Sequence, residues 1–168
     1  MKGSFRISKY MALFHKGLPS GMFDIGRENF HDIAKEVLGS GKGLVFVAGG
    51  SSMSPFIKHG DTVEIRPYRS LRLGDVAFLR NHEGQLVLHR VIKITEAGIV
   101  TRGDAAEGDD GFTPFGDVLG KAVKSSGYNF HLKFPFNRLI ARGFIRPSKL
   151  SRHGLIFPLA KRIASLLG

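Results

Sequence analysis

The sequence contains no cysteine. Disulfide bonds and thiolate metal sites are therefore excluded, and the fold must rest on packing and hydrogen bonding. Long apolar runs are missing too: the longest candidates are Leu44–Ala48 and Leu155–Ala160, whereas a membrane-spanning helix needs roughly 20 residues. The basic segment Met1–Tyr10 precedes no apolar stretch of signal-peptide length. We therefore expect no secretory signal and no transmembrane helix, and a cytoplasmic or peripherally membrane-associated protein.

Acidic residues are absent from the C-terminal part of the chain. All 14 Asp and Glu lie within residues 1–117, beside 15 Lys and Arg, whereas residues 118–168 carry 10 Lys and Arg and no acid. The net charge of +11 is thus concentrated near the C-terminus. This concentration of positive charge favours an anionic partner, which can be lipid, nucleic acid or an acidic protein.

The length and the pattern of the chain predict one domain with two appendages. We expect an N-terminal extension at residues 1–42, a β domain at 43–134 and a basic amphipathic tail at 135–168. Residues 1–26 have several Gly and Pro breakers and are predicted to be irregular. Residues 27–38 predict a short helix, because their apolar residues recur at helical spacing.

Short strands are predicted from residue 43 onwards. They span Leu44–Ala48, Thr62–Arg66, Val76–Arg80, Leu86–Ile94, Ile99–Arg102, Val118–Lys124 and Tyr128–Phe134. Asn81–Gln85 contains Gly84 and predicts a hairpin loop, and residues 103–117, rich in Gly and Asp, predict a functional loop. Many short strands at this spacing favour a mainly β fold, a small and partly closed antiparallel structure.

The tail at residues 135–168 carries two basic amphipathic segments on either side of Pro147, which we expect to be helices. A segment of this kind can lie on an anionic membrane surface. The alternative is a helical cap over the β structure, with its basic face in water.

A candidate nucleophile follows the first predicted strand, in Gly49-Gly50-Ser51-Ser52. A serine hydroxyl needs a base to take its proton and donors to hold the oxyanion that forms. The glycines allow a sharp turn that exposes the hydroxyl and points N–H groups at a carbonyl. On its own, a turn of this composition is more often structural.

A candidate base lies inside the predicted strand at residues 86–94. Alternation places His89 on one face with Val87 and Val91, and a neutral imidazole there can accept a proton. Asp104 and Asp110 follow the next strand, and a carboxylate beside the imidazole would orient it. The plainer alternatives are a structural histidine and solvated acidic turns. The other histidines lack metal-ligand spacing, so we expect no metal site and no cofactor.

Several motifs, in order, resemble those of the signal peptidase I family. Ser52-Met53-Ser54-Pro55 resembles its Ser-Met-x-Pro nucleophile box. Val87-Leu88-His89-Arg90-Val91 is similar to its general-base strand, in the histidine form of the archaeal and endoplasmic-reticulum members. Thr101-Arg102-Gly103-Asp104 with Asp109-Asp110 resembles the Lys-Gly-Asp…Asp-Asp segment of that branch. The resemblance covers about residues 44–124, with Gly60-Asp61, Leu73-Gly74-Asp75-Val76 and the closing strand from Gly116 to Val123.

The resemblance implies a fold of the signal-peptidase type and a serine endopeptidase that cleaves a peptide or precursor protein after small residues. Ser52 would be the nucleophile and His89 the general base. Asp110 would orient His89, and Asp104 would be a supporting carboxylate.

The resemblance also implies how the substrate is held. Bacterial members often have a serine two positions before the nucleophile, and this chain has Gly50 there. The oxyanion hole would therefore be formed by backbone N–H groups at Ser51 and Ser52. Met53, Val87 and Val91 are candidates for substrate contact.

Two other readings remain open. Self-cleaving SOS-type repressors share this kind of β domain, but they use lysine as the base. A non-enzymatic basic module could instead bind nucleic acid or a membrane surface through the tail and its phenylalanines. Of these partners, nucleic acid is the less expected.

Overall fold

The computed structural model describes residues 10–12, 22–24, 27–126, 128–130, 137–139 and 141. The predicted fold class is confirmed, since the molecule is mainly antiparallel β with few helices. The elements are β1 Tyr10–Ala12, β2 Met22–Asp24, α1 Arg27–Gly39, β3 Leu44–Val47, β4 Thr62–Arg66, β5 Val76–Arg80, β6 Leu86–Ile94, β7 Gly98–Arg102, β8 Phe112–Pro114, a 3-10 turn Phe115–Asp117, β9 Val118–Ser125 and β10 Tyr128–Asn129.

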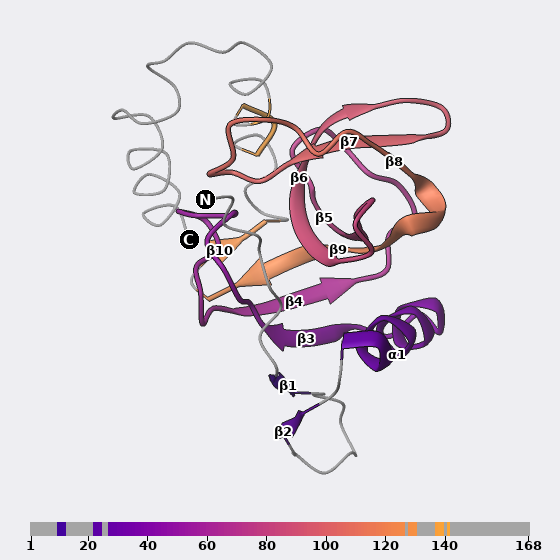
Figure 1. Ribbon diagram of the computed structural model, residues 1–168, viewed down its shortest axis with the longest axis vertical. Helices are drawn as coiled ribbons and strands as arrows, with labels where there is room; N and C mark the ends of the chain where they lie inside the picture. The colour runs from indigo at the N-terminus through magenta and orange to yellow at the C-terminus, as the bar shows by residue number, and fades with distance from the viewer. Residues whose placement is uncertain are drawn as a thin grey trace.

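One sheet organises the molecule, in the order β3-β4-β9-β5-β6-β7-β8, with β10 paired to β9. Its strand pairs are antiparallel, and β9 returns late in the chain to lie between β4 and β5 (Figure 1). The turn with Ser52 follows β3, and His89 lies on β6. Strand β9 therefore joins the β3–β4 pair, from which the Ser52 turn extends, to the β5–β8 strands that include His89.

Most predicted boundaries agree with the structure, and two predictions were wrong. Residues 1–26 are not irregular throughout, because β1 and β2 form an antiparallel pair. The loop predicted at 103–117 contains β8, which pairs with β7. Three-residue strands carry too little alternation to be found by pattern. In the structure, Gly98 lets β8 approach, since a Cβ at this position would collide with the carbonyl oxygen of Thr113.

The sheet buries both of its faces. On one face α1 packs against the strands, and Phe46 contacts Phe30 with ring centroids 5.8 Å apart and Phe78 at 5.3 Å. The other face forms a second cluster of Ala77, Leu79, Val87, Val91, Ile99 and Val118. The predicted alternation along β6 is thus confirmed, since Leu88 lies in the first cluster and Val87 in the second.

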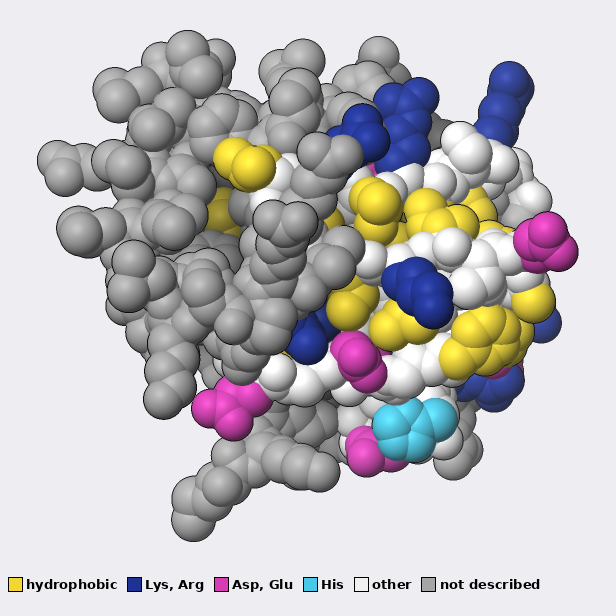
Figure 2. Space-filling view, turned by 90° about the horizontal axis from the view of Figure 1, so that it is seen from above, with side chains coloured by type: hydrophobic (Ala, Val, Ile, Leu, Met, Phe, Trp, Pro, Cys, Tyr) yellow, Lys and Arg dark blue, Asp and Glu magenta, His cyan; other side chains and the backbone are white. Residues whose placement is uncertain are grey.

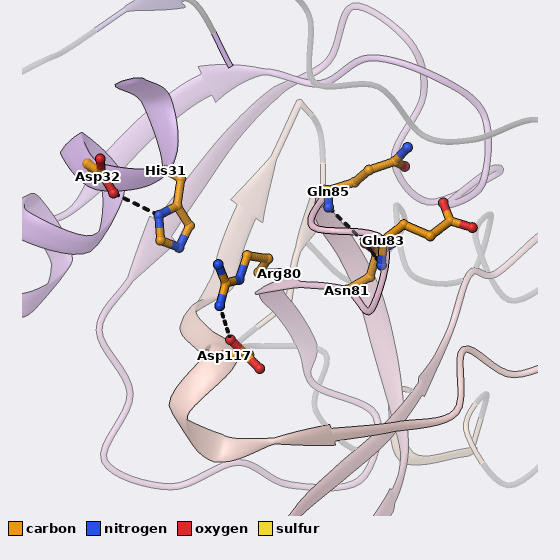
Figure 3. A network of polar contacts seen from close by, with 7 residues as sticks. All are labelled: His31, Asp32, Arg80, Asn81, Glu83, Gln85 and Asp117. Atoms are coloured by element: carbon orange, nitrogen blue, oxygen red, sulfur yellow. Dashed lines mark hydrogen bonds and ion pairs between the residues drawn. The ribbon is translucent and has the colours of Figure 1, made fainter. Parts of the chain in front are cut away.

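The β5–β6 hairpin sets the position of His89. Asn81 Oδ1 accepts hydrogen bonds from the N–H groups of Glu83 (3.1 Å) and Gln85 (2.8 Å), and Arg80 forms an ion pair with Asp117 at 3.0 Å (Figure 3). The predicted hairpin loop is therefore confirmed. The register that it fixes pairs Ala77 with His89.

The predicted tail lies mostly outside the described residues. Asn137 is fully buried, and Gly74 accommodates its backbone, because a Cβ at position 74 would collide with it. Among the described residues the exposed large hydrophobic side chains are Ile94, Phe112 and Leu139. On the face shown in Figure 2, apolar side chains alternate with charged and polar ones. No helix in the described part combines the length and the apolarity that crossing a bilayer requires.

Candidate active site

Two backbone hydrogen bonds close the base of the turn that carries Ser52, and Gly50 allows the backbone conformation of the turn. The N–H of Ala48 donates to the carbonyl of Asp61, and the N–H of Gly60 donates to the carbonyl of Ala48, both at 2.8 Å. Gly50 has a φ of 84°, a conformation that glycine adopts without steric cost. Ser52 is half-buried at the end of this turn. The turn therefore places the Ser52 hydroxyl beside the sheet.

The structure brings Ser52 and His89 together across 37 residues of sequence. Ser52 Oγ lies 3.0 Å from His89 Nε2, which is within hydrogen-bonding distance. His89 is 8% exposed on β6. In the tautomer with its proton on Nδ1, the ring accepts a hydrogen bond from the serine hydroxyl at Nε2. This is the contact that a serine nucleophile needs from its base.

Asp110 completes the arrangement on the far side of the ring. Its Oδ2 lies 2.6 Å from His89 Nδ1, and it also accepts a hydrogen bond from Thr101 Oγ1 at 2.7 Å. The N–H of Asp110 donates to the carbonyl of Thr101 at 2.9 Å. Three side chains distant in sequence, those of Ser52, His89 and Asp110, therefore form one chain of contacts.

Asp104 has a different partner. Its two carboxylate oxygens accept hydrogen bonds from Nε and Nη2 of Arg90, both at 2.7 Å, and neither side chain is exposed. Arg90 also donates to the carbonyl of Gly74 at 2.8 Å, and its guanidinium lies over the Phe56 ring. Burial raises the pKa of the Asp104 carboxyl, and the charge and hydrogen bonds of Arg90 oppose that rise. The pair holds the loop after β7 against β6.

Gly103 allows this loop to approach the serine. A Cβ at position 103 would lie 2.8 Å from the Ser52 carbonyl oxygen and 3.3 Å from His89 Nε2. The N–H of Ala105 donates to the same Ser52 carbonyl at 2.8 Å. In the sequence, Gly103 and Thr101 stood out only as parts of a motif, without a role of their own. The one signal available was their place in that motif, with Thr101 at the end of a strand and Gly103 directly after it.

The two residues predicted for the oxyanion hole lie at the surface of the turn. Ser51 is exposed and Ser52 is half-buried. Within the described part of the chain, no hydrogen bond engages the N–H of Ser52. This amide is therefore free to serve as a donor to a substrate.

The residues predicted for substrate contact are buried. Met53 is 0% exposed in the main core, and Val87 and Val91 are 2% and 0% exposed in the second cluster. The face that the valines share with His89 is filled by Leu79 and its neighbours. In this conformation none of the three offers appreciable surface to a peptide, so their predicted role finds no support here.

No group of three or more His, Asp or Glu side chains in the described part is placed to hold a metal ion. The chemistry that the described residues can perform is that of a hydroxyl activated by an imidazole, which is itself oriented by a carboxylate.

Comparison with known proteins gives a family match. Residues 11–101, more than half of the 168 residues, match the family described as Peptidase S24-like. The match includes Ser52 and His89 and ends before Asp104 and Asp110. Neither a curated protein nor a solved structure matches the chain. The chain therefore belongs to the Peptidase S24-like family, whose fold is that of serine peptidases and self-cleaving repressors.

Proposed function

We propose that this protein is a serine endopeptidase of the signal-peptidase type, in which Ser52 is the nucleophile, His89 the general base and Asp110 the orienting carboxylate. The observation that carries the proposal is the continuous contact from Ser52 Oγ to His89 Nε2 (3.0 Å) and from His89 Nδ1 to Asp110 Oδ2 (2.6 Å). Membership of the Peptidase S24-like family supports the serine peptidase class.

The proposed reaction begins when Ser52 Oγ attacks the peptide carbonyl carbon while His89 Nε2 takes the hydroxyl proton. The imidazolium that forms is stabilised by the Asp110 carboxylate. When the tetrahedral intermediate collapses, the C–N bond breaks and His89 gives its proton to the leaving amine. Water, deprotonated by His89, then attacks the acyl carbon. The ester C–O bond breaks, His89 returns its proton to Ser52 Oγ, and the acyl product leaves as a carboxylic acid.

The oxyanion of the tetrahedral intermediate needs hydrogen-bond donors. The free N–H of Ser52 is the nearest backbone candidate, with Ser51 beside it. Gly50 has no hydroxyl to add. We therefore assign the oxyanion hole to the backbone of the turn, where each donor removed from such a site typically costs about 10²- to 10³-fold in turnover.

The proposed substrate is an extended peptide with small residues before the scissile bond. This specificity rests on the resemblance of the Ser52-Met53-Ser54-Pro55 and Val87–Val91 motifs to those of signal peptidases. An extended peptide binds through main-chain hydrogen bonds, and shallow sites admit only small side chains. The pocket residues stay unassigned, because Met53, Val87 and Val91 are buried.

A library of fluorogenic peptides that vary the residues before the scissile bond tests the proposal. The full chain should cleave those with small residues there. Ser52→Ala should lower turnover by about 10³-fold or more. Ser54→Ala is the matched control, since Ser54 lies in the same turn and its backbone N–H, not its side chain, donates a hydrogen bond to the carbonyl of Ser51. Equal cleavage by wild-type and Ser52→Ala proteins would remove Ser52 from the nucleophile role.

Self-cleavage is the second candidate function, because the matched family includes self-cleaving repressors. A self-cleaving chain should be cut at a rate independent of its concentration, whereas cleavage in trans should rise with concentration. Intact-mass spectrometry of the purified chain over time, at several concentrations, separates the two. Cutting of the wild-type chain alone, with no turnover of added peptides, would favour the self-cleaving candidate.

We also propose that residues 135–168 bring the protein to an anionic membrane surface. The support is the charge of this part of the sequence, which carries Lys and Arg but no acid. Each basic residue near such a surface contributes about 1 kcal/mol to binding. Flotation with anionic and neutral vesicles, with and without residues 135–168, tests the proposal. Equal binding of the full chain to both vesicles would contradict it.

A further inference from the structure

One residue, Thr101, holds Asp110 at two points, its backbone N–H and its carboxylate. Thr101 accepts a hydrogen bond from the Asp110 N–H at 2.9 Å through its carbonyl, and its hydroxyl donates to Asp110 Oδ2 at 2.7 Å. The same Oδ2 is the atom that lies 2.6 Å from His89 Nδ1. Thr101 thus contacts the oxygen that faces the imidazole.

The side chain of Thr101 is held rigidly by the fold. Thr101 lies in β7, where it pairs with Val91 of β6, and its side chain is 0% exposed. A buried, β-branched side chain in a strand has little freedom about χ1, so the direction of its hydroxyl is fixed.

Asp110 has little other support from its own loop. The preceding residues Glu107, Gly108 and Asp109 are exposed. The following residue, Gly111, has a φ of 77°, in the region that favours glycine. A loop of this kind does not fix a carboxylate by packing, so its orientation depends on the bonds from β7.

We propose that Thr101 is a positioning residue, which holds Asp110 Oδ2 in the direction that accepts the His89 Nδ1 proton. The inference rests on the proposed function, because it concerns the same Ser52–His89–Asp110 unit. Thr101 touches neither the substrate nor the reacting atoms in this account. Its loss lets the carboxylate turn toward water and leaves the imidazole poorly oriented.

The variant Thr101→Val removes the hydroxyl and keeps the shape of the side chain. Misplacement of a catalytic group by about 1 Å can lower the rate by about 10²-fold, so we expect kcat for peptide cleavage to fall by about 10- to 100-fold with little change in KM. Thr101→Ser restores the hydroxyl and should recover most of the lost turnover. In an Asp110→Ala background, Thr101→Val should have no further effect, because Thr101 acts through Asp110.

Thr113→Val is the matched control. Thr113 is buried in β8, the neighbouring strand, and it makes no hydrogen bond to Asp110. It should retain wild-type turnover. Thermal unfolding of all variants shows whether the fold is kept.

A second readout does not require any peptidase activity. Proton NMR of the full chain should show a protected resonance for the His89 Nδ1 proton, assigned by its loss in His89→Gln. It should persist in Ser52→Ala and Thr101→Ser and disappear or broaden in Thr101→Val.

The proposal is overturned if folded Thr101→Val keeps both wild-type kcat and this resonance, or if it lowers kcat equally in the presence and absence of the Asp110 carboxylate. If Ser52→Ala cleaves peptides as the wild type does, the proposed function fails, while the NMR comparison still decides the role of Thr101.

Discussion

His89 and Arg90 are neighbours on β6, and each pairs with an aspartate of the segment that follows β7. The His89–Asp110 pair keeps 11% and 19% of its side-chain surface exposed, whereas the Arg90–Asp104 pair keeps none. A pair that reaches solvent can pass a proton to a substrate. A pair without exposed surface, such as Arg90–Asp104, cannot do so, and we infer that it holds the loop in place. The alternation of a strand thus separates the proposed chemistry from the structural support within two consecutive residues.

The largest effect should follow from removing the proposed base. His89→Gln should lower peptide turnover by about 10³-fold or more, since members of such a unit each cost this much when removed alone. Its free energy of unfolding should change by only about 1 kcal/mol. Steady-state kinetics and urea unfolding of the same preparation test both statements. A variant that unfolds but retains activity per folded molecule would reverse the assignment of the two pairs.

Removing one partner of the buried Arg90–Asp104 pair should lower stability as well as activity. Arg90→Met leaves the Asp104 carboxylate buried without its partner, and a broken buried pair costs about 3 to 5 kcal/mol of stability. Urea unfolding should show this loss, and the remaining folded fraction should lose activity as the loop detaches. Arg90→Met with Asp104→Leu should recover part of the stability. No recovery in the double variant would mean that the pair is not an isolated unit.

Gly103→Ala should affect activity more than stability. The added methyl group would lie 2.8 Å from the Ser52 carbonyl oxygen and 3.3 Å from His89 Nε2, so the loop or the serine must shift. We expect turnover to fall by about 10²-fold, with about 1 to 3 kcal/mol lost from stability. Gly108→Ala is the control, because a Cβ at this position meets nothing within 4 Å. Equal activity of the two variants would show that the loop is free to move.

Lowering the pH should have the smallest effect. Because a general base must be unprotonated to accept the serine proton, turnover should fall as the pH is lowered from the pH of highest activity. Circular dichroism over the same pH range should stay constant while the Arg90–Asp104 pair holds the fold. A turnover that stays constant down to the pH at which the protein unfolds would exclude His89 as the base.

Much of the fold could be predicted from the sequence where the local pattern is strong. The bounds of β4, β5 and β6 follow from alternation between turn residues, and α1 follows from apolar residues at helical spacing. The strands β1, β2 and β8 could not be predicted in this way, because their pairing depends on distant partners rather than on three residues of pattern.

Part of the site could also be predicted, because its motifs follow one another in a recognisable order along the chain. Ordered motifs located Ser52, His89 and the two aspartates. The pattern could not decide which aspartate faces the imidazole, since both follow β7; the structure places Asp110 there and pairs Asp104 with Arg90. The contacts of Thr101 and Gly103 were not predictable from spacing, because they arise from how the loop folds back onto β3 and β6. The burial of Met53 was also missed, since the turn folds it inward.

The most direct test of the proposed chemistry is acid-quenched mass spectrometry of the chain during cleavage of a peptide. If Ser52 is the nucleophile, the acyl half of the peptide becomes attached to Ser52, and Ser52→Ala forms neither this adduct nor products at an appreciable rate. Products formed at the wild-type rate by Ser52→Ala, or an acyl group attached to another residue, would contradict this role of Ser52.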